Sequence, residues 1–177
     1  MKNTTKLVTL AMFAAISILL VYLIRFPIFP AIGFMEYDPA DVPIFIATFL
    51  FGPWAGLMLT AVVAVLQGIT VSAQSGPIGI LMHFLATGTF VLVTGLLTRN
   101  SKGIKRTAFA SAIGVIAWIV IMFFWNLLLT PIFMGVPRDA VIGLMPLILA
   151  FNAIKAGVNS LLAVGLHNRL SKLKLFR

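Results

Sequence analysis

The chain has 177 residues, of which 61% are apolar and 10% are charged, and its mean hydropathy is +1.12. Soluble domains carry about 45–50% apolar and about 25% charged residues, so a soluble fold could not bury this apolar surplus. We therefore expect an all-α integral membrane bundle, with residues 1–177 forming a single transmembrane domain. The chain has no cysteine, which excludes disulfides and thiolate metal sites.

The net charge of +9 would favour a nucleic-acid partner in a soluble protein. Here the basic residues cluster at the ends of apolar segments, a distribution that is typical of membrane topology. We therefore expect the lipid bilayer as the surroundings of this chain, with the basic residues at its aqueous boundaries. We expect no nucleic-acid partner.

The first apolar run, residues 7–24, is predicted to be a retained transmembrane helix. Lys2 and Lys6 precede it, as basic residues precede the apolar part of a signal peptide. The run is longer than the roughly 7–15 apolar residues of a signal peptide, and no small-x-small cleavage site follows it. Arg25-Phe26-Pro27 follows instead, so we interpret the run as a membrane-spanning helix.

No charged residue occurs from Val42 to Thr98, a stretch long enough for about three crossings of a ~30 Å hydrocarbon core. Two clusters of helix-breaking residues, Gly52-Pro53 and residues 72–77, divide it. The predicted helices are residues 39–51, 53–70 and 77–98. The first of these has two possible N-caps, Asp38 and Asp41, and either choice places an acid at a helix N-terminus.

Two more helices are predicted, at residues 107–130 and 140–168. A basic loop that includes Arg99 and Arg106 precedes the fifth helix, and a loop from Pro131 to Asp139 separates the fifth from the sixth. The six predicted helices would place both termini on the same side of the membrane.

The 13 basic residues test this six-helix topology. Only Arg25 and Arg138 fall on the side opposite the termini, and Lys155 lies within the membrane. Ten fall on the side of the termini: Lys2, Lys6, Arg99, Lys102, Lys105, Arg106, Arg169, Lys172, Lys174 and Arg177. All four acids fall on the opposite side: Glu36, Asp38, Asp41 and Asp139. Because basic residues concentrate in cytoplasmic loops, both termini are predicted to be cytoplasmic.

Lys155 is the most informative polar residue within the predicted helices. It shares one helical face with Asn152 and Asn159, which are spaced i, i+3 and i+7. A lysine at this depth either reaches the membrane interface, pairs with an interior acid or belongs to a ligand site. Reaching the interface is difficult from a helix centre, and we expect no acid within the helices. We therefore favour a ligand site.

Other polar residues occupy the half of the bundle away from the termini. Asn126 lies on the fifth helix and Gln67 on the third, while His83, Thr87 and Thr89 lie on the fourth. Each residue alone is more often an interhelical hydrogen-bonding group. Together with Lys155 they favour a pocket that opens to the outside.

The loop from Arg25 to Asp41 contains aromatic and apolar side chains: Phe26, Phe29, Phe34, Met35 and Tyr37. They indicate either an interfacial aromatic belt or a lid over the pocket. A pocket with one cation, several amides and aromatic walls fits a flat, largely neutral ligand that carries hydroxyl groups. It does not fit a nucleotide, which needs several basic groups or a glycine-rich cradle.

Several motifs of enzymes and ATPases are missing. The sequence has no G-x-x-x-x-G-K-[ST], H-E-x-x-H or G-x-S-x-G. We therefore expect neither ATP binding of the P-loop kind nor an enzyme, and we expect no cofactor. Ala11-x-x-x-Ala15 on the first helix is a small-xxx-small pattern, which would let another helix approach closely.

Four motifs, spread over nearly the whole chain, resemble those of a known family: residues 34–43 (Phe-Met-Glu-Tyr-Asp-Pro-Ala-Asp-Val-Pro), Phe51-Gly52-Pro53 with Gly56, residues 79–90 and residues 151–157. In these motifs, in size and in six-helix layout, the chain resembles the S components of energy-coupling factor (ECF) vitamin transporters, most closely the riboflavin-specific ones. The Gly-Pro element is general to S components, whereas residues 79–90 and 151–157 resemble the riboflavin-specific members. His83 departs from the pattern, in which we expect asparagine.

The resemblance implies a prokaryotic plasma-membrane protein that captures riboflavin from outside. Its partners would be a transmembrane scaffold subunit and two cytoplasmic ATPase subunits, which power reorientation of the S component. Ala11 and Ala15 match the family's scaffold-docking motif, and Asn126, Asn152 and Lys155 match its vitamin-binding residues. The expected substrate-binding set also includes Gln67, Phe34, Met35, Glu36, Tyr37, Asp38, His83, Thr87 and Gly88.

Three other functions remain open. An S component for another vitamin, such as pantothenate or thiamine, is the first, although Lys155 argues against a cationic vitamin. A small membrane enzyme that acts on lipid would need a charged catalytic cluster, and the loop at residues 99–106 has no acids. A self-sufficient secondary transporter would show paired half-repeats with intramembrane acids, and neither is evident.

Overall fold

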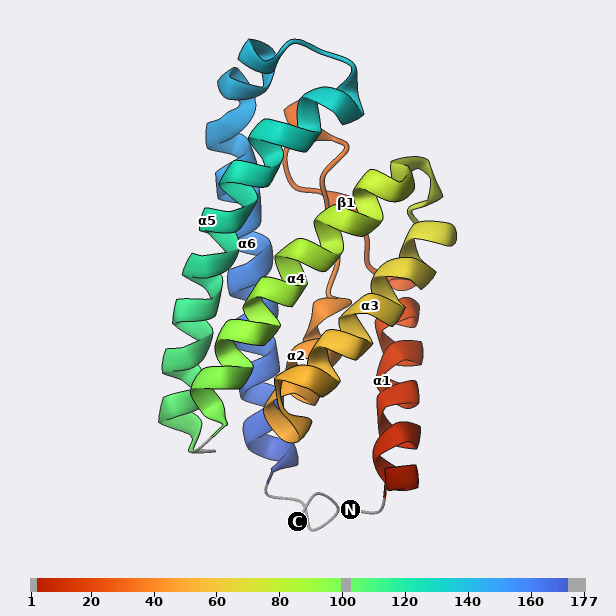
Figure 1. The fold of residues 1–177 in the computed structure, drawn as a ribbon, viewed down its shortest axis with the longest axis vertical. Coiled ribbons are helices and arrows are strands. Elements are labelled where there is room, and N and C mark those ends of the chain that lie inside the picture. The colour runs from red at the N-terminus through yellow and green to blue at the C-terminus, as the bar shows by residue number, and fades with distance from the viewer. Residues whose placement is uncertain (1–2, 100–102, 172–177) are drawn as a thin grey trace.

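The structure is a computed structural model that describes residues 3–99 and 103–171. Six α-helices make up most of this described part (Figure 1). They are α1 (Asn3–Leu23), α2 (Asp41–Phe51), α3 (Pro53–Ile69), α4 (Gly76–Thr98), α5 (Ile104–Met134) and α6 (Arg138–Leu170). The predicted all-α bundle of six helices is therefore confirmed.

The six helices are not equal in length. Within the described residues, α1, α4, α5 and α6 are long and apolar enough to cross a membrane. The remaining two are apolar but shorter, with 11 residues in α2 and 17 in α3. At about 1.5 Å per residue, α2 is only roughly 16 Å long, so it cannot cross a ~30 Å hydrocarbon core by itself.

The helices pack around α2, which contacts α1, α3, α4 and α6. In chain order, α3 packs on α4, α4 on α5 and α5 on α6, and α1 packs against α2 and α3. Figure 1 shows α4 running obliquely across the bundle between α3 and α5. Of the 11 residues of α2, nine are buried, from Asp41 to Phe49. The shortest helix therefore forms the centre of the bundle.

The boundaries of α2 and α5 differ from the prediction. Helix α2 begins at Asp41, and its N-cap residue is Ala40 rather than Asp38 or Asp41. Helix α5 continues through Pro131 to Met134. Proline was expected to end it, but the helix accommodates Pro131 with the loss of one backbone hydrogen-bond donor, as α6 accommodates Pro146. The helix ends instead at Gly135, whose φ of 65° gives the left-handed cap that glycine adopts readily.

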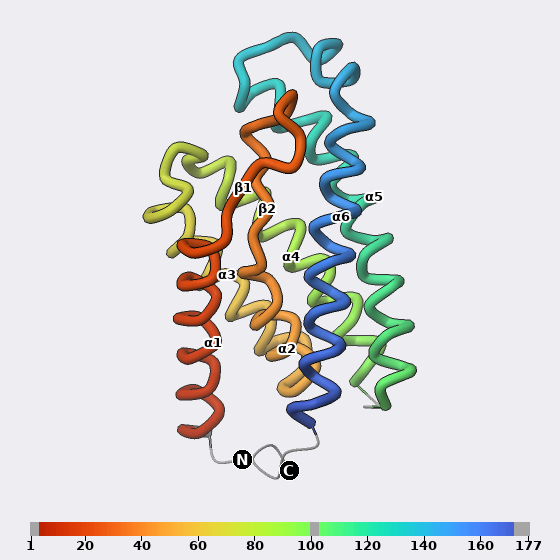
Figure 2. The backbone as a smooth tube through the Cα atoms, turned by 180° about the vertical axis from the view of Figure 1, so that it is seen from behind, coloured from red at the N-terminus to blue at the C-terminus, as the bar shows by residue number. Residues whose placement is uncertain are grey.

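The loop between α1 and α2 contains a small β-hairpin that the sequence did not predict. Strand β1 (Phe26–Pro27) pairs antiparallel with β2 (Glu36–Tyr37), and a 3₁₀ turn, η1 (Pro30–Ile32), lies between them. Figure 2 shows this hairpin between the upper end of α1 and the middle of α6. A second 3₁₀ turn, η2 (Ala73–Ser75), joins α3 to α4.

Helix α1 begins and α6 ends at the same end of the bundle, here called the terminal end (Figures 1 and 2). The β-hairpin lies toward the other end, here called the hairpin end. The helix ends at the terminal end carry these described basic residues: Lys6, Arg99, Lys105, Arg106 and Arg169. Lys2, Lys102, Lys172, Lys174 and Arg177 lie outside the described residues. The side of the membrane that each end faces stays a prediction.

The terminal half of the bundle is tightly packed. The Phe45 and Phe90 rings stack with their centroids 3.8 Å apart, and Trp118 meets Phe45 edge-on. Helix α3 begins so close to α4 that a Cβ atom on Gly95 would lie 2.6 Å from the Cβ atom of Pro53. Because only glycine allows this approach, α3 and α4 are in close contact on the terminal side of the aromatic stack. The open space of the bundle lies in the other half.

Candidate functional site

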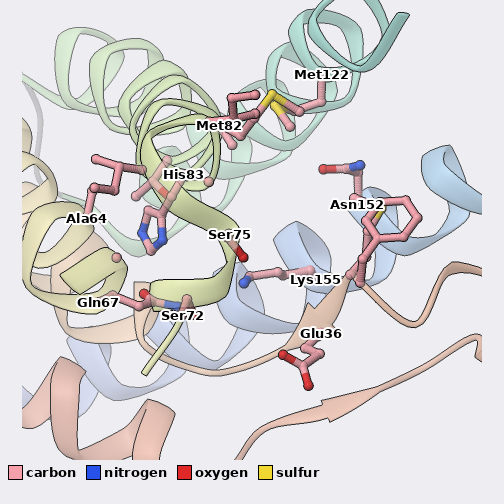
Figure 3. A pocket seen from close by; sticks show the side chains of 18 of the residues that line it. Glu36, Ala64, Gln67, Ser72, Ser75, Met82, His83, Met122, Asn152 and Lys155 are labelled. Carbon is pink, nitrogen blue, oxygen red and sulfur yellow. The ribbon is translucent and has the colours of Figure 1, made fainter. Parts of the chain in front are cut away.

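A cavity lies between α3, α4, α5 and α6 toward the hairpin end, and residues of the β-hairpin form part of its wall. Its space is about 1020 Å³ when the open mouth is included. That figure includes open solvent, and the space that the centre of a water molecule can reach is about 180 Å³. Figure 3 shows side chains from several segments pointing into it.

The cavity brings together ten of the predicted substrate-binding residues. Phe34, Met35, Glu36 and Asp38 come from the segment between α1 and α2, and Gln67 comes from α3. His83 and Thr87 come from α4, Asn126 from α5, and Asn152 and Lys155 from α6. The structure brings these ten side chains together around one cavity, and their role in binding stays a prediction.

Two predicted residues do not line the cavity. Gly88 faces α3, where a Cβ atom would lie 3.3 Å from Leu57. The Tyr37 hydroxyl points instead toward α6, where it donates a hydrogen bond to Asn159 Oδ1 at 3.0 Å. Burial raises the pKa of Tyr37 above its usual value of 10, so this hydroxyl stays protonated and remains a donor.

Lys155 has an acidic partner in Asp38, which lies just before α2, and the buried Asp41 is the first residue of α2, so the expectation of no acid within the helices is wrong. The Nζ atom of Lys155 lies 2.7 Å from Oδ2 of Asp38, and both side chains are mostly buried. The other carboxylate oxygen of Asp38 accepts a hydrogen bond from the backbone N–H of Ala40 at 3.0 Å. Asp38 was expected at the membrane surface. The chain instead enters the bundle before α2 begins and carries this carboxylate inside.

Asp41, the first residue of α2, is fully buried and joins three helices. It accepts hydrogen bonds from Thr87 of α4 at 2.7 Å and from Asn159 of α6 at 3.1 Å. His83 Nε2 lies 3.4 Å from the same carboxylate. Asn159 also donates to the backbone carbonyl of Asp38 at 3.0 Å. This network holds the segment that carries Asp38, and so holds the carboxylate with which Lys155 pairs.

Asn126 and Asn152 keep hydrogen-bonding capacity for a ligand. Asn152 accepts from the indole N–H of Trp118 at 2.8 Å and donates to the carbonyl of Ile148. Asn126 accepts from Thr130 at 2.9 Å and donates to a backbone carbonyl of its own helix. Each carboxamide has two N–H groups and two acceptor lone pairs, so one donor and one acceptor of each remain uncommitted. These bonds hold the two amides in fixed orientations.

The apolar residues that α5 and α6 contribute to the cavity wall were not predicted. Its members on α5 are Trp118, Met122 and Phe133, and Phe151 of α6 adds a further ring. A signal was present, because Trp118 and Met122 lie eight and four residues before Asn126 and therefore share its helical face. The aromatic residues that were predicted to cover the pocket come from the loop at residues 25–41, and these apolar neighbours of Asn126 on α5 were missed.

A three-part contact, here called the clasp, lies at the mouth of the cavity. Arg25 follows α1 and forms an ion pair with Glu36 of β2. Its guanidinium also donates a hydrogen bond to the backbone carbonyl of Val71, in the connection between α3 and η2. Arg25 thus ties the hairpin to the far side of the mouth. Both cations of the cavity wall, Arg25 and Lys155, are paired with carboxylates, so the wall is close to electrically neutral.

The predicted docking residues Ala11 and Ala15 lie away from the cavity. Both are exposed on α1, on the surface that this helix does not turn toward α2 and α3. Small side chains at this spacing leave a shallow surface that another helix can approach. Their role in docking stays a prediction.

Comparison with known proteins identifies the family. The model of the family described as "ECF transporter, substrate-specific component" matches residues 5–167. A solved S component of a bacterial ECF transporter superposes with a TM-score of 0.82 at 28% identity, covering 96% of this chain and 97% of that one. ThiT from Listeria monocytogenes shares the fold, with a TM-score of 0.71 at 16% identity over 97% of this chain and 98% of that one.

Curated relatives carry the name riboflavin transporter. FmnP of Bacillus subtilis is 33% identical over 70% of this chain and 65% of its own length. RibU of Lactococcus lactis is 31% identical over 71% of this chain and 62% of its own length, so the chain spans less than two thirds of these two relatives. RibU of Staphylococcus aureus is 28% identical over 97% of this chain and 93% of its own length. The chain is a multi-pass membrane protein and a transporter component rather than an enzyme: it belongs to the family of substrate-specific (S) components of ECF transporters.

Proposed function

We propose that this chain captures riboflavin at the outer face of a prokaryotic plasma membrane and delivers it inward. S components pair with an ECF energising module. In this proposal the module consists of a transmembrane scaffold subunit, which docks at Ala11 and Ala15, and two cytoplasmic ATPases. The termini face the cytoplasm and the cavity opens outward, in one transmembrane domain.

The observation that carries the proposal is the composition of the cavity wall. Asn126 and Asn152 offer fixed, partly uncommitted amides beside the ring of Trp118. A flavin combines a flat apolar ring with polar ring edges and a hydroxyl chain, so it needs both kinds of group. The riboflavin transporters among the curated relatives support the same ligand.

Charge argues for a neutral vitamin. The cavity wall contains carboxylates, so the presence of Lys155 alone does not exclude a cationic ligand such as thiamine. However, Asp38 is paired with Lys155 and Glu36 with Arg25. A cationic or anionic ligand would have to break one of these pairs, which costs several kcal/mol when the pair is buried. A neutral ligand leaves both pairs intact.

The test is purification in detergent followed by titration. The purified protein should carry flavin absorbance or, once stripped, should quench the fluorescence of added riboflavin at a one-to-one ratio. A hundredfold excess of thiamine or pantothenate should not displace the flavin. Displacement by either vitamin, or the absence of any riboflavin binding by folded protein, would reject the proposal in favour of another ligand.

A further inference from the structure

A groove lies between α3 and α4 on the apolar outer surface of the bundle, where Figure 1 shows the two helices side by side. Its space is about 550 Å³, a figure that includes the open space at its outer face. Its lining residues on α3 are Ala61, Ala64 and Val65, and those on α4 include Ile80, Leu81 and Phe84. Every lining side chain is apolar, and no charged residue occurs from Val42 to Thr98. The groove therefore offers nothing to a polar ligand.

Close contacts between the two helices bound the groove at both ends. Toward the hairpin end, a Cβ atom on Gly68 would lie 2.1 Å from Cγ1 of Ile80. Toward the terminal end, a Cβ atom on Gly88 would lie 3.3 Å from Cδ1 of Leu57. The stretch of α3 between Leu57 and Gly68 is about 17 Å long at ~1.5 Å per residue. The groove is thus a short hollow with two ends and not an open seam along the helices.

The groove and the ligand cavity share a wall. Ala64 of α3 and Ile80 of α4 line both spaces. Figure 3 shows Ala64 on the side of the cavity where His83 and Gln67 lie. Only the thickness of one residue separates the two spaces at these positions. Whatever fills the groove therefore supports the wall of the cavity from outside.

The surroundings and the shape of the groove favour a lipid chain as its occupant. An empty groove would forfeit the van der Waals contacts of its lining, and water would find no hydrogen-bond partners there. A partner helix is about 10–12 Å across with its side chains, so it cannot enter a hollow between two helices that touch at both ends. A lipid acyl chain is thin, flexible and as apolar as the lining.

We infer that an acyl chain of a bilayer lipid lies in the groove between α3 and α4 and supports the wall formed by Ala64 and Ile80. The bound lipid keeps the cavity in the shape that binds its ligand. The headgroup lies outside the groove, because the lining carries no charge. The site is distinct from the ligand cavity, and only the affinity measurement below rests on the proposed function.

Native mass spectrometry of protein in detergent with added dioleoyl phosphatidylcholine tests the lipid site. The wild-type protein should retain a single lipid. Val65→Phe should retain none, because the larger ring fills the groove, and Ala61→Leu is a second filling variant. Val62→Phe is the matched control: Val62 and Val65 are 49% and 48% exposed on the same helix, but Val62 does not line the groove. The control should retain the lipid as wild type does.

Riboflavin titration of the same proteins, with and without this lipid, tests the support of the wall. Removal of the lipid should weaken riboflavin binding by wild type and by Val62→Phe about fivefold, the effect of a methyl-sized void. The affinity of Val65→Phe should not depend on lipid, because its own side chain fills the groove. Thermal unfolding shows whether each variant is folded, and Ala61→Leu replaces Val65→Phe if the latter is not.

The outcomes separate the lipid site from the proposed function. A wild-type protein that retains no lipid, or equal retention by the filling variants and Val62→Phe, would overturn the site. Riboflavin affinity that does not change with lipid would overturn the support of the wall. If wild type retains the lipid in the groove but binds no riboflavin, the proposed function fails and the lipid site stands.

Discussion

Lys155 Nζ lies 2.7 Å from Asp38 Oδ2, which joins the middle of α6 to the segment that leads into α2. The two residues are far apart in sequence, and both line the cavity. The pair lies at the cavity wall with its side chains 13% and 4% exposed. Because neither charge is well solvated, each residue depends on the other, and a substitution at one changes the environment of both.

Substitutions at this pair should be strongly coupled. Lys155→Met removes the ligand-facing donor and leaves Asp38 unpaired, so riboflavin affinity should fall roughly 5- to 150-fold. Asp38→Asn should also weaken binding, and the double variant should lose less than the sum of the two free-energy changes. Fluorescence titration of the four proteins measures this cycle. The exposed Lys105→Met serves as the control and should bind as wild type does. Additive losses would show that the two residues contribute to binding independently and not as a pair.

Loss of the clasp should accelerate ligand release. Arg25→Gln removes the charge that connects the hairpin to the α3–η2 connection, so the mouth should open more often. We expect the dissociation rate constant of riboflavin to rise by about fivefold or more, since a charge-assisted contact contributes about 1.5–3 kcal/mol. A stopped-flow chase with excess unlabelled ligand measures this rate. Arg138→Gln, at the same end of the bundle but outside the cavity, should have no effect. An unchanged rate in Arg25→Gln would mean that the clasp does not control the mouth.

Bulky residues on the exposed face of α1 should separate binding from uptake. Replacing Ala11 and Ala15 by leucine leaves the cavity untouched but blocks the close approach of a partner helix. Riboflavin binding in detergent should be unchanged, and uptake by vesicles that contain the energising module and ATP should be lost. Ile16→Phe, on a different exposed part of the same helix, should transport normally. Normal uptake by the double variant would place the docking surface elsewhere.

Cysteine labelling should establish the orientation in the membrane. The chain has no cysteine of its own, so a single introduced thiol is the only reactive one. Ala31→Cys in η1 and Ser171→Cys after α6 lie at opposite ends of the bundle, and both positions are exposed. An impermeant thiol reagent should label the first in intact cells and the second only after lysis. Labelling of Ser171→Cys from outside would reverse the predicted topology.

The sequence allowed the helices to be predicted well because lipid imposes a simple rule: apolar stretches between charged or helix-breaking residues become helices. It also placed Asn152 and Lys155 on one face, since helical spacing is fixed. The partner of Lys155 could not be predicted in this way. Asp38 lies in a segment rich in turn residues, and no periodic pattern connects it to α6.

The sequence did not predict the β1–β2 hairpin, for a different reason. Each strand has two residues, which is too short for alternation of polar and apolar side chains to be visible. The predicted end of α5 was wrong because the helix accommodates Pro131 and continues to the left-handed cap at Gly135. The end of α5 thus had a local signal in Gly135, whereas the hairpin had none.

The unequal helix lengths have a mechanical consequence. On one flank, α3 has 17 residues and is roughly 26 Å long; on the opposite flank, α5 and α6 have 31 and 33 residues and are about 47 and 50 Å long. Figure 1 shows the two tall helices rising beyond the rest. A hydrocarbon layer of ~30 Å is slightly too thick for the first flank and far too thin for the second. The bundle is therefore a wedge, and hydrophobic mismatch acts on its two flanks in opposite directions. A change in the thickness of the surrounding lipid would therefore act unequally on the two flanks and favour a different tilt of the molecule, without any contact to a ligand or nucleotide.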